Sequence, residues 1–100
     1  MLIIEGWLRL GPGEFAKLKG AASTMVAVTR TEAGCIHYAF AQDIDEPDLI
    51  RISEKWEGQA ALDAHFASPH MASFNQAMSG LAQLGADIRL YSAEELRKLI

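Results

Sequence analysis

The order in which strand and helix patterns follow one another limits this chain to few folds. Apolar and polar side chains alternate along residues 2–10, and such alternation predicts a strand. Two more strands are predicted at residues 35–43 and 49–57, separated by an acidic turn that contains Pro47. A fourth strand is predicted at residues 85–91. The first two predicted strands are separated by a helical pattern, and so are the last two.

Apolar residues at spacings of three and four predict the helices. The first helix follows Pro12 and is predicted to stop before Gly34. The second helical region, residues 58–81, is predicted to break in its middle, where Ser68 has the position of an N-cap and Pro69 that of a first helical residue. The spacing of "SAEE" (Ser92 to Glu95) is that of a capping box and predicts a short terminal helix, residues 93–100.

This order, β-α-β-β-α-β, predicts a ferredoxin-like α+β fold with a four-stranded antiparallel sheet and helices on one face. Residues 1–100 suit a single domain. The predicted first strand has apolar residues on both faces, since Ile3 and Trp7 oppose Leu2 and Ile4. Helices can cover only one face of the sheet, so we expect a second copy of the chain to cover the other and form a homodimer.

The composition argues against several kinds of partner. The chain has 9 basic and 13 acidic residues, a formal charge of −4 and no basic cluster, so we expect neither nucleic acid nor an anionic membrane as partner. Cys35 is the only cysteine, which excludes an internal disulfide and disfavours a thiolate metal site. The N-terminus does not resemble a signal peptide and no stretch is long enough to cross a bilayer, so we expect a cytoplasmic protein.

Two of the three histidines, His65 and His70, lie five residues apart with a proline between them. Helical zinc motifs place two histidines four residues apart, and a third ligand would have to come from His37 or an unidentified carboxylate. We therefore expect no metal site. His65 lies beside the apolar stripe of its helix and could be a general base, whereas His70 is near unpaired N–H groups of a helix start. For both, a structural role at the helix joint is the simpler interpretation.

Glu54 is the carboxylate with the most unusual surroundings, because Ile50, Ile52 and Trp56 share its strand face. A carboxylate among such residues is costly unless it is paired, hydrogen-bonded or protonated. It could orient a histidine or a substrate hydroxyl. A structural ion pair is the alternative, and its candidate partners are Arg9, Arg51 and Arg89.

Aromatic and sulfur-containing side chains could line a pocket between sheet and helices, although stripes of this kind are more often plain core. The candidates are Tyr38, Trp56, Phe66, Phe74, Met71 and Met78.

Four blocks of the sequence resemble the antibiotic biosynthesis monooxygenase family. They are "EAGCIHYAF" (32–40), "EKWE" (54–57), "ALDAHFASPHM" (61–71) and "DIRLYSA" (87–93). The resemblance implies a dimeric α/β barrel, in which two sheets pack face to face and each subunit has its own pocket. It also implies oxidation of a quinol or another hydroxylated aromatic by dioxygen, without flavin, haem or metal. Haem-degrading relatives have a ligating histidine near the position of Phe74, which disfavours haem chemistry here.

The resemblance further implies roles for particular residues. His65 would be the catalytic base, Tyr38 and Trp56 would contact the substrate, and Glu54 would hold the polar network. Phe66 and Phe74 would complete the binding pocket. Two other functions remain open: an isomerase or lyase that uses His65 as acid and base on a small metabolite, and a ligand-binding stress protein without turnover.

Overall fold

A computed structural model describes residues 1–100 of the chain. In chain order its elements are β1 (Leu2–Leu10), α1 (Glu14–Thr29), β2 (Cys35–Gln42), β3 (Leu49–Trp56), α2 (Gln59–Phe66), α3 (Pro69–Ser79) and β4 (Gln83–Ser92). The strands form one antiparallel sheet in the order β2-β3-β1-β4. The predicted ferredoxin-like α+β fold, with its second helix broken in two, is confirmed.

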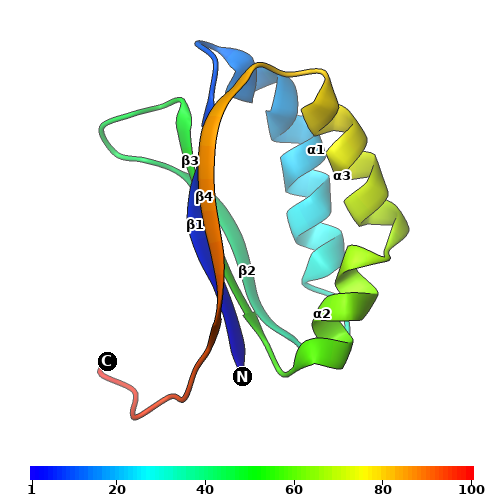
Figure 1. Cartoon of the computed structure of the whole chain (residues 1–100), viewed down its shortest axis with the longest axis vertical. Coiled ribbons are helices and arrows are strands. Elements are labelled where there is room, and N and C mark those ends of the chain that lie inside the picture. The colour runs from blue at the N-terminus through cyan, green and yellow to red at the C-terminus, as the bar shows by residue number, and fades with distance from the viewer.

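All three helices lie on one face of the sheet, and no element of the chain covers the opposite face (Figure 1). The β2–β3 loop and the residues after β4 project away from the helices (Figure 1). No helix is both long and apolar enough to span a membrane. The uncovered face, called the outer face below, carries Trp7 with the guanidinium of Arg9 5.3 Å from the centre of its ring.

Strand alternation and helical spacing together build the core between the two layers. On β1, Ile4, Leu8 and Leu10 point to the helices and are buried. On α1 the buried residues follow one stripe at spacings of three and four, namely Leu18, Ala22, Met25 and Thr29. The stripe continues to Thr29 despite the β-branched residues of the last turn, because tertiary packing outweighs their weak helix propensity.

The break between α2 and α3 lies where the sequence predicts it. The hydroxyl of Ser68 accepts a hydrogen bond from the backbone N–H of Met71 at 3.2 Å, so Ser68 is the N-cap of α3. Pro69 is the first residue of α3, a position at which its missing N–H costs nothing.

The predicted terminal helix is wrong, since residues 93–100 form no regular structure. Its apolar side chains have no surface to pack against: Leu96, Leu99 and Ile100 are 80% or more exposed. A capping box cannot by itself offset the entropic cost of ordering so short a helix, because most helical stability comes from packing of an apolar face.

Candidate active site

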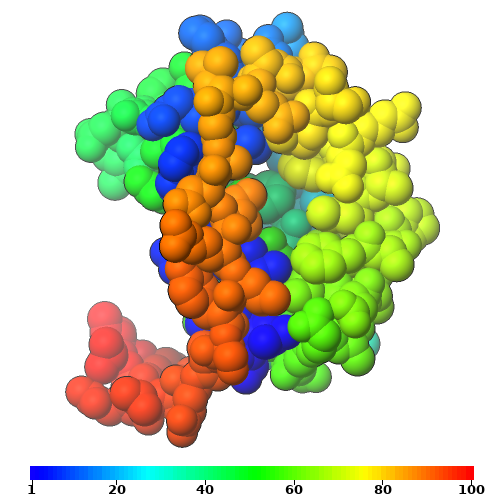
Figure 2. Space-filling model, in the orientation of Figure 1, coloured from blue at the N-terminus to red at the C-terminus, as the bar shows by residue number.

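A cavity of about 470 Å³ lies between the inner face of the sheet and helices α2 and α3. Figure 2 shows the hollow between β4 and the two helices. The cavity is open there because α3 does not cover β4, whose inward residues Ile88 and Leu90 remain about half exposed. Hydrophobic side chains make up 12 of its 16 lining residues. The lining consists of Ile4, Leu8, Met25, Tyr38, Phe40, Ile52, Glu54, Phe66, Met71, Phe74, Asn75, Met78, Ser79, Gln83, Ala86 and Ile88.

Most of the pocket residues predicted from the sequence line this cavity. Tyr38, Glu54, Phe66 and Phe74 line the cavity, as do the two methionines at 71 and 78. Trp56 does not line it, because its side chain is completely buried in the core cluster formed with Tyr38 and Leu62. A direct contact between Trp56 and a ligand is therefore absent from this arrangement.

Glu54 is a buried carboxylate, and its partner is Trp56. The indole Nε1–H of Trp56 donates a hydrogen bond of 2.9 Å to Oε1 of Glu54. Burial raises the pKa of Glu54, while the bond from Trp56 and the nearby His65 oppose the rise. A carboxyl group with a raised pKa beside an apolar cavity is a better proton acceptor than a free carboxylate.

None of the three arginines considered as partners of Glu54 reaches it. Arg9 pairs with Glu46, Arg51 with Asp43 and Arg89 with Asp87. The ion-pair interpretation is wrong because successive residues of a strand point to opposite faces, and these arginines belong to the outer face.

Tyr38 supplies a second polar group at the cavity. Its ring lies 5.3 Å from the ring of His65 and 5.2 Å from that of Phe40, centre to centre. Burial raises the pKa of Tyr38, with the carboxylates of Glu54 and Glu32 contributing in the same direction. The phenol therefore stays protonated at physiological pH, and it can donate a hydrogen bond to a ligand oxygen.

His65 lies in the last turn of α2 and is almost entirely enclosed, with 1% of its surface exposed. Its ring packs against Trp56 at a centroid distance of 4.8 Å, and it does not belong to the cavity lining. Its Nδ1 lies 2.9 Å from Oε1 of Glu32. A carboxylate only accepts hydrogen bonds, so this contact assigns the proton of a neutral His65 ring to Nδ1 and leaves a lone pair on Nε2.

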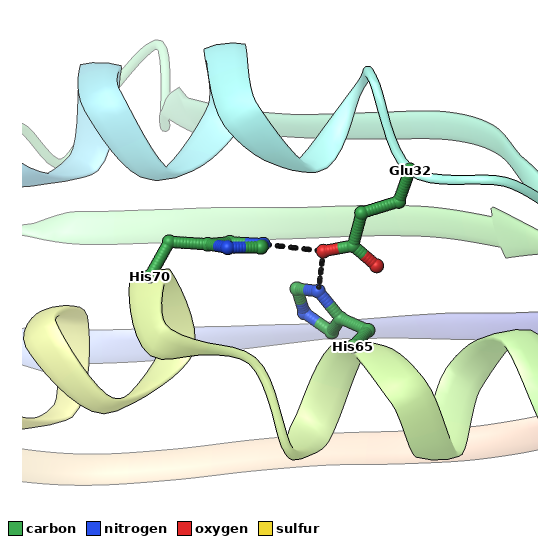
Figure 3. A group of neighbouring side chains, drawn as sticks. All are labelled: Glu32, His65 and His70. Atoms are coloured by element: carbon green, nitrogen blue, oxygen red, sulfur yellow. Dashed lines mark hydrogen bonds and ion pairs between the residues drawn. The ribbon is translucent and has the colours of Figure 1, made fainter.

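His70 meets the same carboxylate. Its Nε2 contacts Oε1 of Glu32, and the hydroxyl of Ser68 lies 3.2 Å from that nitrogen. Figure 3 shows how Glu32, from the turn between α1 and β2, reaches both rings at the joint between α2 and α3. The third histidine, His37, is exposed on β2 and plays no part in this cluster.

Sequence reasoning gave Glu32 no role and left that of His70 open. The only available signal was that Glu32 opens the block "EAGCIHYAF", which carries part of the family resemblance. Glu32 is 33 residues from His65 and 38 from His70, and no local spacing connects such positions.

A family model described as "Antibiotic biosynthesis monooxygenase" matches residues 1–77. The chain belongs to this family. The resemblance seen in the four sequence blocks is thus confirmed.

Comparisons with individual proteins extend the similarity to nearly the whole chain. "Probable quinol monooxygenase YgiN" of Escherichia coli K12 is 30% identical over 90 residues, which cover 80% of this chain and 86% of that protein. "Uncharacterized protein sll1783" of Synechocystis is 29% identical over 98 residues, which cover 98% of this chain and 67% of that protein. The crystal structure of a Deinococcus radiodurans protein assigned to the same family superposes with a TM-score of 0.88 at 27% identity, covering 100% and 99% of the two chains.

Proposed function

We propose that the protein is a monooxygenase that oxidises a quinol or a similar hydroxylated aromatic with dioxygen. The observation that carries this proposal is the cavity of about 470 Å³. Its lining is mostly hydrophobic and includes the polar side chains of Glu54 and Tyr38. This volume lies in the range of small-molecule sites. The apolar walls suit an aromatic ring, and the two polar groups suit its hydroxyls. Family membership and the name of the Escherichia coli relative support the same reaction class.

The proposed reaction balances without an added reductant. A quinol and one dioxygen molecule give a hydroxyquinone and one water molecule. One oxygen atom enters the ring and the other leaves as water, and the substrate supplies all four electrons. A deprotonated quinol can pass an electron to dioxygen directly, so we expect no flavin, haem or metal in this step. The protein has to deprotonate the substrate, orient it and exclude water.

We assign His65 as the base. Glu32 holds the proton of the ring on Nδ1, so the lone pair of Nε2 is free to take the hydroxyl proton of a quinol. Rings that line the cavity, Tyr38 and Phe66, contact His65, so the histidine lies one side chain behind the wall. Phe66 is half exposed and can turn aside at little cost in burial to let a hydroxyl reach the imidazole.

Glu54 is the second candidate for the base, because it lines the cavity directly and burial raises its pKa. The two assignments differ in what a substitution removes. If His65 is the base, Glu54→Gln keeps the proton acceptor and weakens only substrate positioning. If Glu54 is the base, the same substitution removes turnover.

Dioxygen uptake by metal-stripped, flavin-free protein, measured with a panel of reduced quinols and polyhydroxylated aromatics, tests the proposal. We expect uptake above the autoxidation rate of each compound. His65→Ala should lower kcat by at least about 100-fold, the usual contribution of a general base. His37→Ala is the matched control, because it removes an exposed histidine outside the cluster, and its kcat should be unchanged. If dioxygen uptake is no faster than autoxidation for all of the compounds tested, the proposed function is contradicted.

We also propose that residues 1–100 act as one domain and pair with a second copy through the outer face. The support is the position of Trp7, Arg89 and Tyr91 around a shallow hollow of about 370 Å³ on that face, which no part of the chain covers. A domain of this size gains considerable stability when it buries more surface in a dimer. Light scattering coupled to size-exclusion chromatography measures the mass directly, and a monomer at micromolar concentration would contradict the pairing.

A further inference from the structure

We propose that Glu32, His65 and His70 form a binding site for a divalent transition-metal ion such as Zn²⁺. The three potential ligand atoms, one carboxylate oxygen and two imidazole nitrogens, all lie within 4.8 Å of one another. None of these residues lines the cavity, so the site lies behind the wall of the proposed substrate pocket and shares His65 with the proposed reaction.

The kinds of ligand are those that zinc and similar ions prefer. Two histidines with one carboxylate are a known set of protein ligands for Zn²⁺, and they leave further coordination positions for water. Donor atoms around a tetrahedral Zn²⁺ ion lie roughly 3.4 Å apart, given metal–ligand distances near 2.1 Å. The 2.9 Å between Nδ1 of His65 and Oε1 of Glu32 is close to that separation, so small side-chain rotations would open space for an ion.

The surroundings hold the three side chains in place and leave a path for the ion. His65 is fixed by packing against Trp56, and the Ser68 hydroxyl donates to the carbonyl oxygen of His65 at 2.6 Å. The side chains of Glu32 and His70 keep 15% and 16% exposure, so an ion can enter from solvent on their side. A second carboxylate, Glu54, lies within electrostatic range of Glu32 and adds negative potential when it is ionised.

The sequence pointed away from a metal because the two histidines are five residues apart with a proline between them, and because the third ligand could not be identified. Glu32 is that ligand. Since His65 and His70 both contact one oxygen of Glu32, the alternative is a purely structural hydrogen-bonded cluster. The two possibilities differ in one measurable property, which is whether the metal-free protein binds Zn²⁺ with an affinity that depends on these side chains.

Metal binding would also change what His65 can do in the proposed reaction, and this consequence depends on the proposed function. An ion bound to Nδ1 takes the lone pair of that nitrogen, so a neutral ring must carry its proton on Nε2. Nε2 then donates a hydrogen bond and cannot accept a substrate proton. The metal-bound protein would therefore lack its base.

Calorimetric titration of metal-stripped protein with Zn²⁺, in the absence of any substrate, tests the site. We expect one Zn²⁺ per chain, with the affinity falling by more than about 100-fold in His70→Ala and in Glu32→Gln, because each loses a direct ligand. His37→Ala, the matched control, should bind as the wild type does. Visible absorption of the Co²⁺ form should report a nitrogen and oxygen ligand set in the wild type, with the bands lost in both ligand variants.

Two results would overturn the site: a wild-type affinity no higher than that of His70→Ala, or an equal loss of affinity in His37→Ala. Thermal unfolding without metal shows that the variants are folded, and His70→Ala is chosen because its side chain is partly exposed. Saturating Zn²⁺ should abolish quinol oxidation in the wild type and leave that of His70→Ala unchanged. Because Zn²⁺ binding is measured without substrate, absence of oxygen uptake would contradict only the proposed function.

Discussion

Replacement of Glu32 by Ala should destabilise the protein mainly through His65. In the wild type, Glu32 accepts the hydrogen bond from Nδ1 of His65. Only 1% of the surface of His65 is exposed, so water would have to enter a buried position to replace this bond once the carboxylate is gone. His70 loses the same acceptor, but its side chain is 16% exposed and can be hydrated. The cost therefore comes almost entirely from one buried donor left without a partner.

The magnitude follows from that single bond. Hydrogen bonds to charged groups contribute about 1.5 to 3 kcal/mol, so Glu32→Ala should lower the free energy of unfolding by about 2 kcal/mol. For a domain of this size, 1 kcal/mol shifts Tm by about 4 to 8 °C, and the expected decrease is about 8 to 16 °C. The exposed ion pair between Glu46 and Arg9 supplies the control: Glu46→Ala should cost at most about 1 kcal/mol.

Equilibrium unfolding in urea, followed by tryptophan fluorescence with a chelator present, measures both variants. Trp56 is a suitable probe because it is fully buried and packs against the His65 ring. A double-mutant cycle with His65→Ala should give a coupling energy of about 1 to 3 kcal/mol. A loss below about 0.5 kcal/mol in Glu32→Ala, or a coupling near zero, would refute the reasoning that Glu32 satisfies a buried donor.

Three further predictions concern other parts of the molecule. Burial raises the pKa of Glu54, so the folded state binds its proton more tightly than the unfolded state. The free energy of unfolding therefore falls as pH rises from the unfolded pKa of 4.5 through the raised pKa of the folded state. Glu54→Gln should remove this fall, so urea titrations from pH about 4 to 8 should show its stability rising relative to the wild type. Ser68→Ala should cost about 1 kcal/mol in urea unfolding through the lost cap of α3, and an unchanged midpoint would show that the cap contributes nothing. Trp7→Arg should shift the proposed dimer towards monomer in light scattering, whereas an intact dimer would place the partner on another surface.

The fold was predictable because its signals are local. Alternation over residues 2–10 and the helical spacing that follows depend only on neighbours in the chain, and so does the break at Ser68 and Pro69. The terminal helix failed for the opposite reason. Its cap is a local signal, but its stability depends on a packing partner, and a local pattern cannot show that residues 93–100 have none.

The candidate site was only partly predictable. Strand alternation correctly placed Glu54 on the apolar face of its strand, and it also gave the reason to reject Arg51, which points to the other side. A local pattern cannot show which distant segments of the chain come into contact. Glu32 meets His65 only because the turn after α1 comes to the end of α2, and this proximity depends on how the helices pack on the sheet.

The break in the second helical region explains how two histidines at an unsuitable spacing come together. On a continuous helix, positions five residues apart point in directions roughly 140° different, so His65 and His70 could not face one carboxylate. Because α2 ends at Phe66 and α3 begins at Pro69, the chain changes direction between the two histidines, and both rings reach Glu32. The same joint places Phe66 and Met71 on the cavity wall. One short non-helical step thus shapes the proposed substrate pocket and assembles the cluster behind it.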